Sequence, residues 1–148
     1  MGVEDIALGA ILSAAAGYIT QRIIRWEERK ERKKTDKIGA YKKLEGDLET
    51  WRIQSTRARS LDDETGLSDK ALRLADKLDD FEGYHPELID SDIIEPKLEL
   101  DELLAAIRKP SGIPAPDEER WTPIEKSWEP VKTLKKRLKK KRELLEDP

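Results

Sequence analysis

Residues 6–21 read IALGAILSAAAGYITQ and form the only long stretch of the chain without a charged side chain. As a helix, these sixteen residues reach about 24 Å, which is less than the roughly 30 Å hydrocarbon core of a bilayer. Snorkelling of Arg22 would add the turn that contains the next two isoleucines, and Trp26 then falls where interfacial aromatic residues collect. The run Ile6–Ile24 therefore predicts one N-terminal membrane helix that is just able to span.

Charges flank this run unequally. Glu4 and Asp5 precede it, whereas the side that follows is basic. The first basic residues there are Arg22, Arg25, Arg29 and Lys30. A cleaved secretory signal begins with positive charge, so this polarity opposes one, and the positive-inside rule places the bulk of the chain in the cytoplasm. We predict a single-pass protein of the cell membrane, with an anchor at 1–25 and a charged juxtamembrane segment at 26–37.

Small residues recur every four positions inside the run, at Gly9, Ser13 and Gly17. In lipid, such a face lets two helices approach closely, which predicts self-association into a homo-oligomer. An Ala- and Gly-rich helix also produces this spacing by chance. A second interpretation of the run, an Ala-rich helix buried in the core of a soluble protein, stays open as well.

The composition narrows the chemistry of the chain. Its 148 residues are 41% charged, 36% hydrophobic and 5% aromatic, which leaves material for one modest core. There is no cysteine and only one histidine, His85. Disulfide frameworks, thiolate zinc sites, thiol nucleophiles and multi-histidine metal clusters are therefore excluded.

Periodic apolar positions predict an all-α fold. Steps of three and four residues mark a helix from Ile38 to about Ser60, and a second helix with Ser68 as its N-cap that ends at Gly83. Pro96 fits the first turn of a third helix that Pro110 stops. No strand-like alternation occurs. We predict a small antiparallel helical bundle over residues 38–109.

A proline-rich segment follows this bundle. Residues 110–117 read PSGIPAPD, which predicts an extended linker. Beyond it, a basic C-terminal helix is predicted over 118–148. Thr122 and Glu125 have the spacing of a capping box with Pro123 at the first helical position, and Pro130 predicts a kink or a start near Ser127.

Candidate catalytic and metal-binding patterns fail on inspection. Glu82 and His85 have the spacing of a carboxylate-bridged metal motif, but Pro86 disfavours a helical His85, so a turn histidine is predicted. A calcium loop beginning at Asp62 would need glutamate where Arg73 stands and glycine where Leu67 stands. We therefore predict a non-enzymatic protein without catalytic residues, cofactors or metal sites.

Charge alternates along the chain. Residues 1–60 hold 13 basic and 9 acidic residues, and residues 120–148 hold 10 basic and 5 acidic residues. Between them, residues 61–119 hold 6 basic and 18 acidic residues, and the net charge of the whole chain is −3. The ends can therefore neutralise the middle, or each part can attract a different partner. The densest basic run lies in the last part, and its candidate contact residues are Lys132, Lys135, Lys136, Arg137, Lys139, Lys140, Lys141 and Arg142.

These features favour a membrane-tethered interaction or assembly subunit whose expected partners are membrane lipid, a second copy of the chain and another protein. Two alternatives remain open. The small-residue face could build a homo-oligomeric pore or a membrane-disrupting effector. The basic C-terminal helix could bind nucleic acid, which ranks lower because no aromatic residue interrupts the basic run and the whole chain is acidic.

Overall fold

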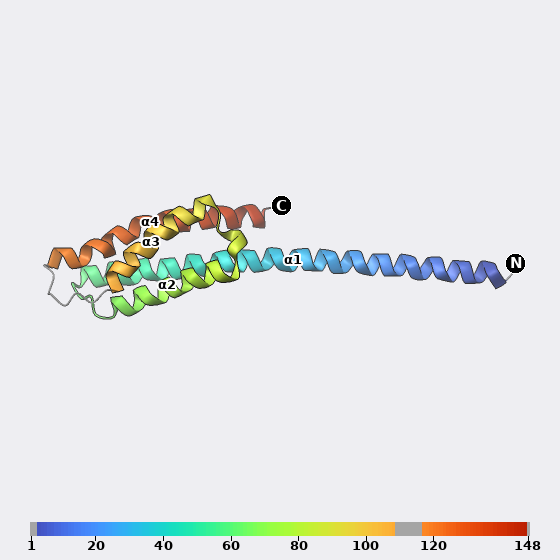
Figure 1. The fold of residues 1–148 in the computed structure, drawn as a ribbon, viewed down its shortest axis with the longest axis horizontal. Helices are drawn as coiled ribbons and strands as arrows, with labels where there is room; N and C mark the ends of the chain where they lie inside the picture. The colour runs from blue at the N-terminus through green and yellow to red at the C-terminus, as the bar shows by residue number, and fades with distance from the viewer. Residues whose placement is uncertain (1–2, 109–116, 148) are drawn as a thin grey trace. The chain divides into compact units, whose positions relative to one another are not determined.

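The computed structural model describes the backbone of residues 3–108 and 117–147, and the side chains of residues 16–108 and 119–147. All regular structure in these residues is helical, so the prediction of an all-α fold is confirmed (Figure 1). The elements are α1 (Val3–Ser60), α2 (Leu67–Tyr84), the short 3-10 helix η1 (Pro86–Leu88), α3 (Ser91–Arg108) and α4 (Asp117–Glu146).

The chain divides into an N-terminal unit, residues 1–36, and a bundle unit, residues 37–148. In the bundle unit, the C-terminal part of α1 lies alongside α2 and α4, and successive helices run in opposite directions (Figure 1). Helix α3 packs against both α2 and α4. Helix α1 contacts α2 through the rings of Tyr41 and Phe81, whose centroids are 6.1 Å apart.

The core of the bundle is built from the apolar stripes that the sequence predicts. On α1, the side chains at the periodic positions from Tyr41 to Ser55 are all buried, and on α2 the same holds from Leu67 to Phe81. Helix α4 contributes Val131, Leu134 and Leu138, each 0% exposed. This burial is the main stabilising contribution to the bundle, because apolar area removed from water is worth about 25 cal/mol per Å².

The ends of α2 differ from the prediction. The N-cap residue is Gly66, not Ser68, and no side chain caps the helix. Gly66 has φ 80°, a left-handed conformation that only glycine adopts without cost, so the turn after α1 places the glycine at the helix boundary. Helix α2 also continues one residue past Gly83, to Tyr84.

Helix α3 begins at Ser91, so the prediction that Pro96 lies in its first turn is wrong. Asp90 provides the cap, because its Oδ1 accepts hydrogen bonds from the backbone N–H groups of Asp92 and Ile93 at 3.1 and 3.2 Å. Helix α3 ends at Arg108, and Pro110 lies outside the described residues.

A proline inside a helix leaves the carbonyl four residues earlier without its donor. For Pro96 that carbonyl belongs to Asp92, and Arg137 of α4 donates to it at 2.7 Å. A side chain from the neighbouring helix thus replaces the missing backbone donor. This replacement explains how α3 continues through the proline.

Helix α4 also begins earlier than predicted. It starts at Asp117, so Thr122 lies inside the helix and the capping-box prediction is wrong, as is a start near Ser127. Pro123 and Pro130 both lie within α4, and Pro130 is fully buried. Its ring therefore serves as apolar core material. Within the predicted linker, residues 110–116 lie outside the described part of the chain.

In the N-terminal unit, every described side chain from residue 16 to residue 36 is exposed. The alternative interpretation of the apolar run, a helix buried in a soluble core, finds no support in residues 16–24. Among the described residues, no helix combines the length and the apolar character needed to cross a membrane. The predicted span at Ile6–Ile24 falls in large part on residues 6–15, whose side chains lie outside the description.

Candidate functional site

Within the described residues, no group of three or more histidine, cysteine, aspartate or glutamate side chains is arranged to hold a metal ion. His85 lies in the turn after α2, as predicted, where its ring centroid is 6.0 Å from that of Phe81. Its Nδ1 lies 3.8 Å from a carboxylate oxygen of Glu87. His85 is therefore a turn residue that lies against Phe81 and near Glu87.

Helix α4 divides the predicted basic residues into two sets. Because Val131, Leu134 and Leu138 face the core, the residues beside them are brought against other helices and the remainder point outward. The inner set is Lys135, Arg137, Lys141 and Arg142, each with a contact to α1, α3 or the residue before α3. The outer set is Lys132, Lys136, Lys139 and Lys140, all exposed.

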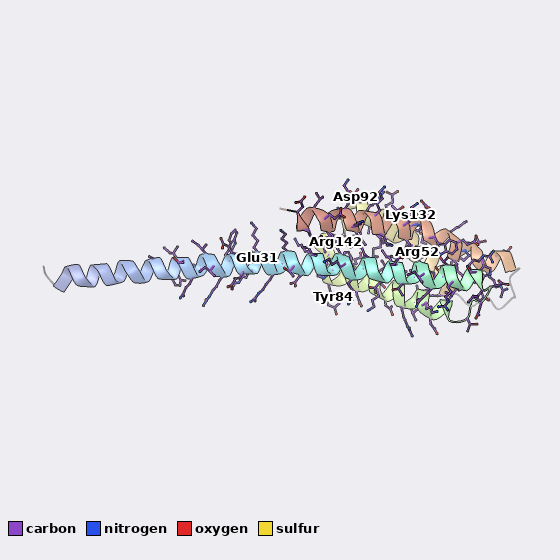
Figure 2. The ribbon with its side chains drawn as sticks, turned by 180° about the vertical axis from the view of Figure 1, so that it is seen from behind. Glu31, Arg52, Tyr84, Asp92, Lys132 and Arg142 are labelled. Carbon is purple, nitrogen blue, oxygen red and sulfur yellow. The ribbon has the colours of Figure 1, made fainter. Side chains whose placement is uncertain are left out.

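Arg142 forms the least exposed ion pair of the inner set. Its Nε donates to Glu45 of α1 at 2.8 Å, and the two side chains are 18% and 15% exposed. The second carboxylate partner of Arg142 is Glu146, one helical turn away, and its Oε2 lies 3.2 Å from the guanidinium. The other oxygen of Glu146 lies 3.4 Å from the Lys42 ammonium. The hydrogen bond with Glu45 raises the pKa of Arg142 further above its usual value. Figure 2 shows Arg142 between α4 and α1.

Glu49 joins α1 to α4 one turn further along. Its carboxylate accepts hydrogen bonds from Arg52 on the same helix and from Lys135 of α4. These two bonds, with that from Arg52 first, lower the pKa of Glu49 to about 2. The carboxylate therefore stays ionised through ordinary acidic pH and continues to hold Lys135.

Lys141 connects α4 to the start of α3. It donates to Asp90 and lies 3.8 Å from Asp92. The hydrogen bond lowers the pKa of the Asp90 carboxyl and raises the pKa of the Lys141 ammonium. The acidic middle of the chain thus neutralises part of the basic C-terminal helix, one of the two possibilities that the charge distribution left open.

Two tryptophans set the register between α1 and α4. The indole of Trp51 donates to the hydroxyl of Ser127 at 3.0 Å, and the indole of Trp128 donates to the hydroxyl of Ser55 at 2.8 Å. Sequence reasoning did not find these bonds. The sequence does place Trp51 and Ser55 four residues apart, on the face of α1 that was predicted to be buried. Polar groups at such positions need hydrogen-bond partners inside the core.

A buried lysine between α2 and α3 was also not anticipated. Lys97 is 2% exposed, and its ammonium lies 2.8 Å from both Glu82 of α2 and Asp101 of α3. Burial lowers the pKa of Lys97, but hydrogen bonds to Asp101 and Glu82 outweigh this effect and leave the pKa raised. Lys97 is therefore a charged cross-link within the bundle.

The outer lysines form an electropositive strip. Lys132, Lys136 and Lys140 follow one another at four-residue spacing and line a surface depression with Glu129 and Arg137. Lys139 stands beside them, with only a weak contact to Glu143 at 3.9 Å. An exposed strip of this kind can attract anionic surfaces or polymers without specifying one.

The predicted juxtamembrane residues belong to the N-terminal unit, in which Arg22, Arg25, Arg29 and Lys30 are all exposed. Within this unit, the Arg22 guanidinium lies 5.9 Å from the ring centre of Tyr18, and the Lys30 ammonium lies 5.2 Å from that of Trp26. Of the proposed self-association face, Gly17 is exposed, and a Cβ added there would meet nothing within 4 Å. The surroundings of positions 9 and 13 lie outside the description, so self-association and a pore stay predictions.

Comparisons with protein-family models, with curated proteins and with solved structures find no match for this chain.

Proposed function

We propose that this chain is a non-enzymatic, membrane-tethered interaction subunit. The N-terminal unit holds the chain at a membrane, and the bundle presents charged helix surfaces to another protein. The proposal extends to a cytoplasmic location for the bundle, because basic residues follow the apolar run.

The observation that supports this proposal is the exposure of apolar side chains in the N-terminal unit. Tyr18, Ile19, Ile23, Ile24 and Trp26 are between 48% and 62% exposed. Soluble proteins seldom leave such a group of large apolar side chains in water, and a membrane interface provides a place for them. The adjacent basic residues add an attraction of about 1 kcal/mol each to anionic headgroups.

The bundle supports the proposal that charged helix surfaces are presented to another protein. The cluster of buried apolar side chains, from Tyr41 to Leu138, lies within the bundle unit. Of the inner cations of α4, Lys135, Lys141 and Arg142 are paired with carboxylates and Arg137 donates to a backbone carbonyl, whereas the outer lysines are exposed. These exposed lysines are the α4 cations that we propose as contacts for a partner.

Flotation with lipid vesicles, followed by a carbonate wash, tests the membrane half. We expect the full chain to float with vesicles and to resist the wash. Ile19→Arg with Ile23→Arg should release it, because two buried charges oppose contact with hydrocarbon. The matched control is Ile53→Arg with Leu72→Arg, since these bundle side chains are 52% and 44% exposed. Recovery of the unaltered chain in the lipid-free fraction contradicts the proposal.

Nucleic-acid binding is a second candidate, favoured by the four exposed lysines of α4. It predicts retention of the chain on DNA or RNA that weakens steeply with salt, since neutralised phosphates release counterions. Lys132→Glu with Lys136→Glu should abolish retention and leave vesicle flotation unchanged. Retention that survives this change, or that does not depend on salt, contradicts this candidate.

A further inference from the structure

A second group of cations lies on α2, away from the basic strip of α4. Residues 61–119 hold only six basic residues, and three of them, Lys70, Arg73 and Lys77, follow one another at steps of three and four. Such steps place side chains on one face of a helix. In the structure all three line a cavity between α2 and α1.

Helix α1 supplies the opposite wall of this cavity, through Asp47, Thr50 and Gln54, and Trp51 and Leu74 complete the lining. The cavity volume is about 170 Å³. Pockets that enclose whole small-molecule ligands run from about 300 to 1,000 Å³. The space therefore encloses one compact polar group, and the rest of a larger ligand would lie outside it.

The charges of the lining are unbalanced. Among the described residues, Lys70, Arg73 and Lys77 take no part in the ion pairs found within 4.0 Å, in contrast to Lys135, Lys141 and Arg142 of α4. Asp47 is the one carboxylate of the lining, against three cations. Burial raises the pKa of Asp47, and the fields of Lys77 and Lys43 oppose that rise. With Asp47 ionised, the lining carries a net charge of about +2.

We propose that this cavity binds the phosphoryl group of a phosphate monoester. At neutral pH such a group carries about −1.5 to −2 charges and three acceptor oxygens, which complement the lining in charge and in donors. The planar fork of Arg73 suits bidentate contact with two phosphate oxygens, and Lys70 and Lys77 add ammonium donors. The Gln54 side chain adds an amide donor on the facing helix.

The rest of the ligand would lie along the surface between α1 and α2. A second cavity continues there and shares Asp47 and Lys77 with the first, and Lys43, Tyr84 and His85 also line it. Tyr84 is 78% exposed and points away from the bundle (Figure 2). A phosphorylated side chain and a phosphorylated metabolite both present the required group, so the experiment must separate them.

Titration of the full chain, followed by the amide NMR signals of α1 and α2 and by calorimetry, tests the proposal. The probes are methyl phosphate and a blocked phosphoserine peptide. We expect saturable binding of at least one probe, with shifts centred on residues 47–54 and 70–77. Tighter binding of the peptide assigns the source to a phosphorylated protein, and equal affinities assign it to a small phosphorylated molecule.

Three variants make this test specific. Arg73→Gln with Lys77→Gln should weaken binding at least about tenfold, because two charge-assisted hydrogen bonds are lost. Lys132→Gln with Lys136→Gln changes the net charge equally on α4 and should leave the affinity unchanged. Asp47→Asn should tighten binding several-fold, since it removes the one carboxylate of the lining.

The proposal is overturned by an equal loss of affinity in the two double variants, which would show a non-specific attraction of the phosphate to exposed cations. It is also overturned if acetate competes as well as methyl phosphate at equal concentration, or if neither probe shifts the α1 and α2 signals. None of these outcomes bears on vesicle flotation, so this inference and the proposed membrane function fail independently.

Discussion

At the scale of single residues, the bundle places polar groups inside its core and satisfies them. Ser55 and Ser127 are 0% exposed, and each accepts a hydrogen bond from a tryptophan on the other helix. Each hydroxyl also donates to a carbonyl of its own helix, at Trp51 and Ile124. A network in which every member is satisfied specifies one register, since a shifted register would leave these groups buried without partners.

We therefore expect Ser127→Ala to destabilise the bundle by about 1–3 kcal/mol, because the indole N–H of Trp51 is left buried without an acceptor. Urea unfolding followed by circular dichroism measures the change. Trp51→Phe should lower the free energy of unfolding by less in the Ser127→Ala background than in the unaltered protein. Ser68→Ala, at an exposed position of α2, is the control. Additive costs would contradict the pairing.

The carboxylate of Glu49 makes the stability of the bundle depend on pH. Its hydrogen bonds from Arg52 and Lys135 lower its pKa from 4.5 to about 2 in the folded protein. The contribution of Glu49 to the free energy of unfolding is therefore present above about pH 4.5 and is lost as the pH falls toward 2. Unfolding of the Glu49→Gln variant should show a shallower dependence on pH in this range. The exposed Glu99→Gln is the matched control, and an unchanged slope for Glu49→Gln would refute the assignment.

At the scale of helices, periodicity predicted the core faces because steps of three and four residues place apolar side chains on one face of a helix. In the structure the stripes of α1 and α2 face the core, and so do Val131, Leu134 and Leu138 of α4. From the sequence, the ion pairs of Glu45, Glu49 and Asp90 with α4 could be predicted only as a general attraction between acidic and basic segments. Their particular partners depend on how α4 is rotated and shifted against α1 and α3, which no local pattern specifies.

The starts of α3 and α4 were predicted less well, because a proline can indicate either the first turn of a helix or a break in its interior. It favours the first turn of a helix, and it disfavours the interior mainly by removing one donor and crowding the preceding turn. At Pro96 a donor from another helix replaces the one removed. At Pro130 the ring is buried in the core. Both compensations are tertiary, so the sequence around each proline does not contain them.

The bond from Arg137 to the Asp92 carbonyl gives a prediction for α3. Arg137→Gln should destabilise the bundle by about 0.5–1.5 kcal/mol, the net value of one hydrogen bond. In a Pro96→Ala background the cost should be smaller, because the substituted alanine supplies a backbone N–H that can bond to the Asp92 carbonyl. A double-mutant cycle measured by thermal unfolding gives this coupling. Equal costs in the two backgrounds would show that Arg137 does not serve the carbonyl.

At the scale of the whole molecule, the two units use their apolar residues differently. The bundle unit collects its apolar side chains in one cluster, from Tyr41 to Leu138. The described apolar side chains of the N-terminal unit remain exposed. The overall hydrophobic content of 36% does not indicate this difference, because it averages over the whole chain. The distribution of apolar residues along the sequence does indicate it, since one part is an uncharged run and the other has periodic stripes.

A variant that begins at Lys37 should therefore fold with the Tm of the full chain and lose its ability to float with vesicles. The reason is that the apolar residues of the core cluster lie at residue 40 and beyond, so the shorter chain keeps its full share of buried area. Calorimetry and the flotation assay measure the two properties in one preparation. A fall in Tm of more than about 4 °C corresponds to about 1 kcal/mol or more. Such a fall would mean that residues 1–36 contribute to the stability of the bundle, and flotation of the shortened chain would move the lipid contact to the helices of the bundle.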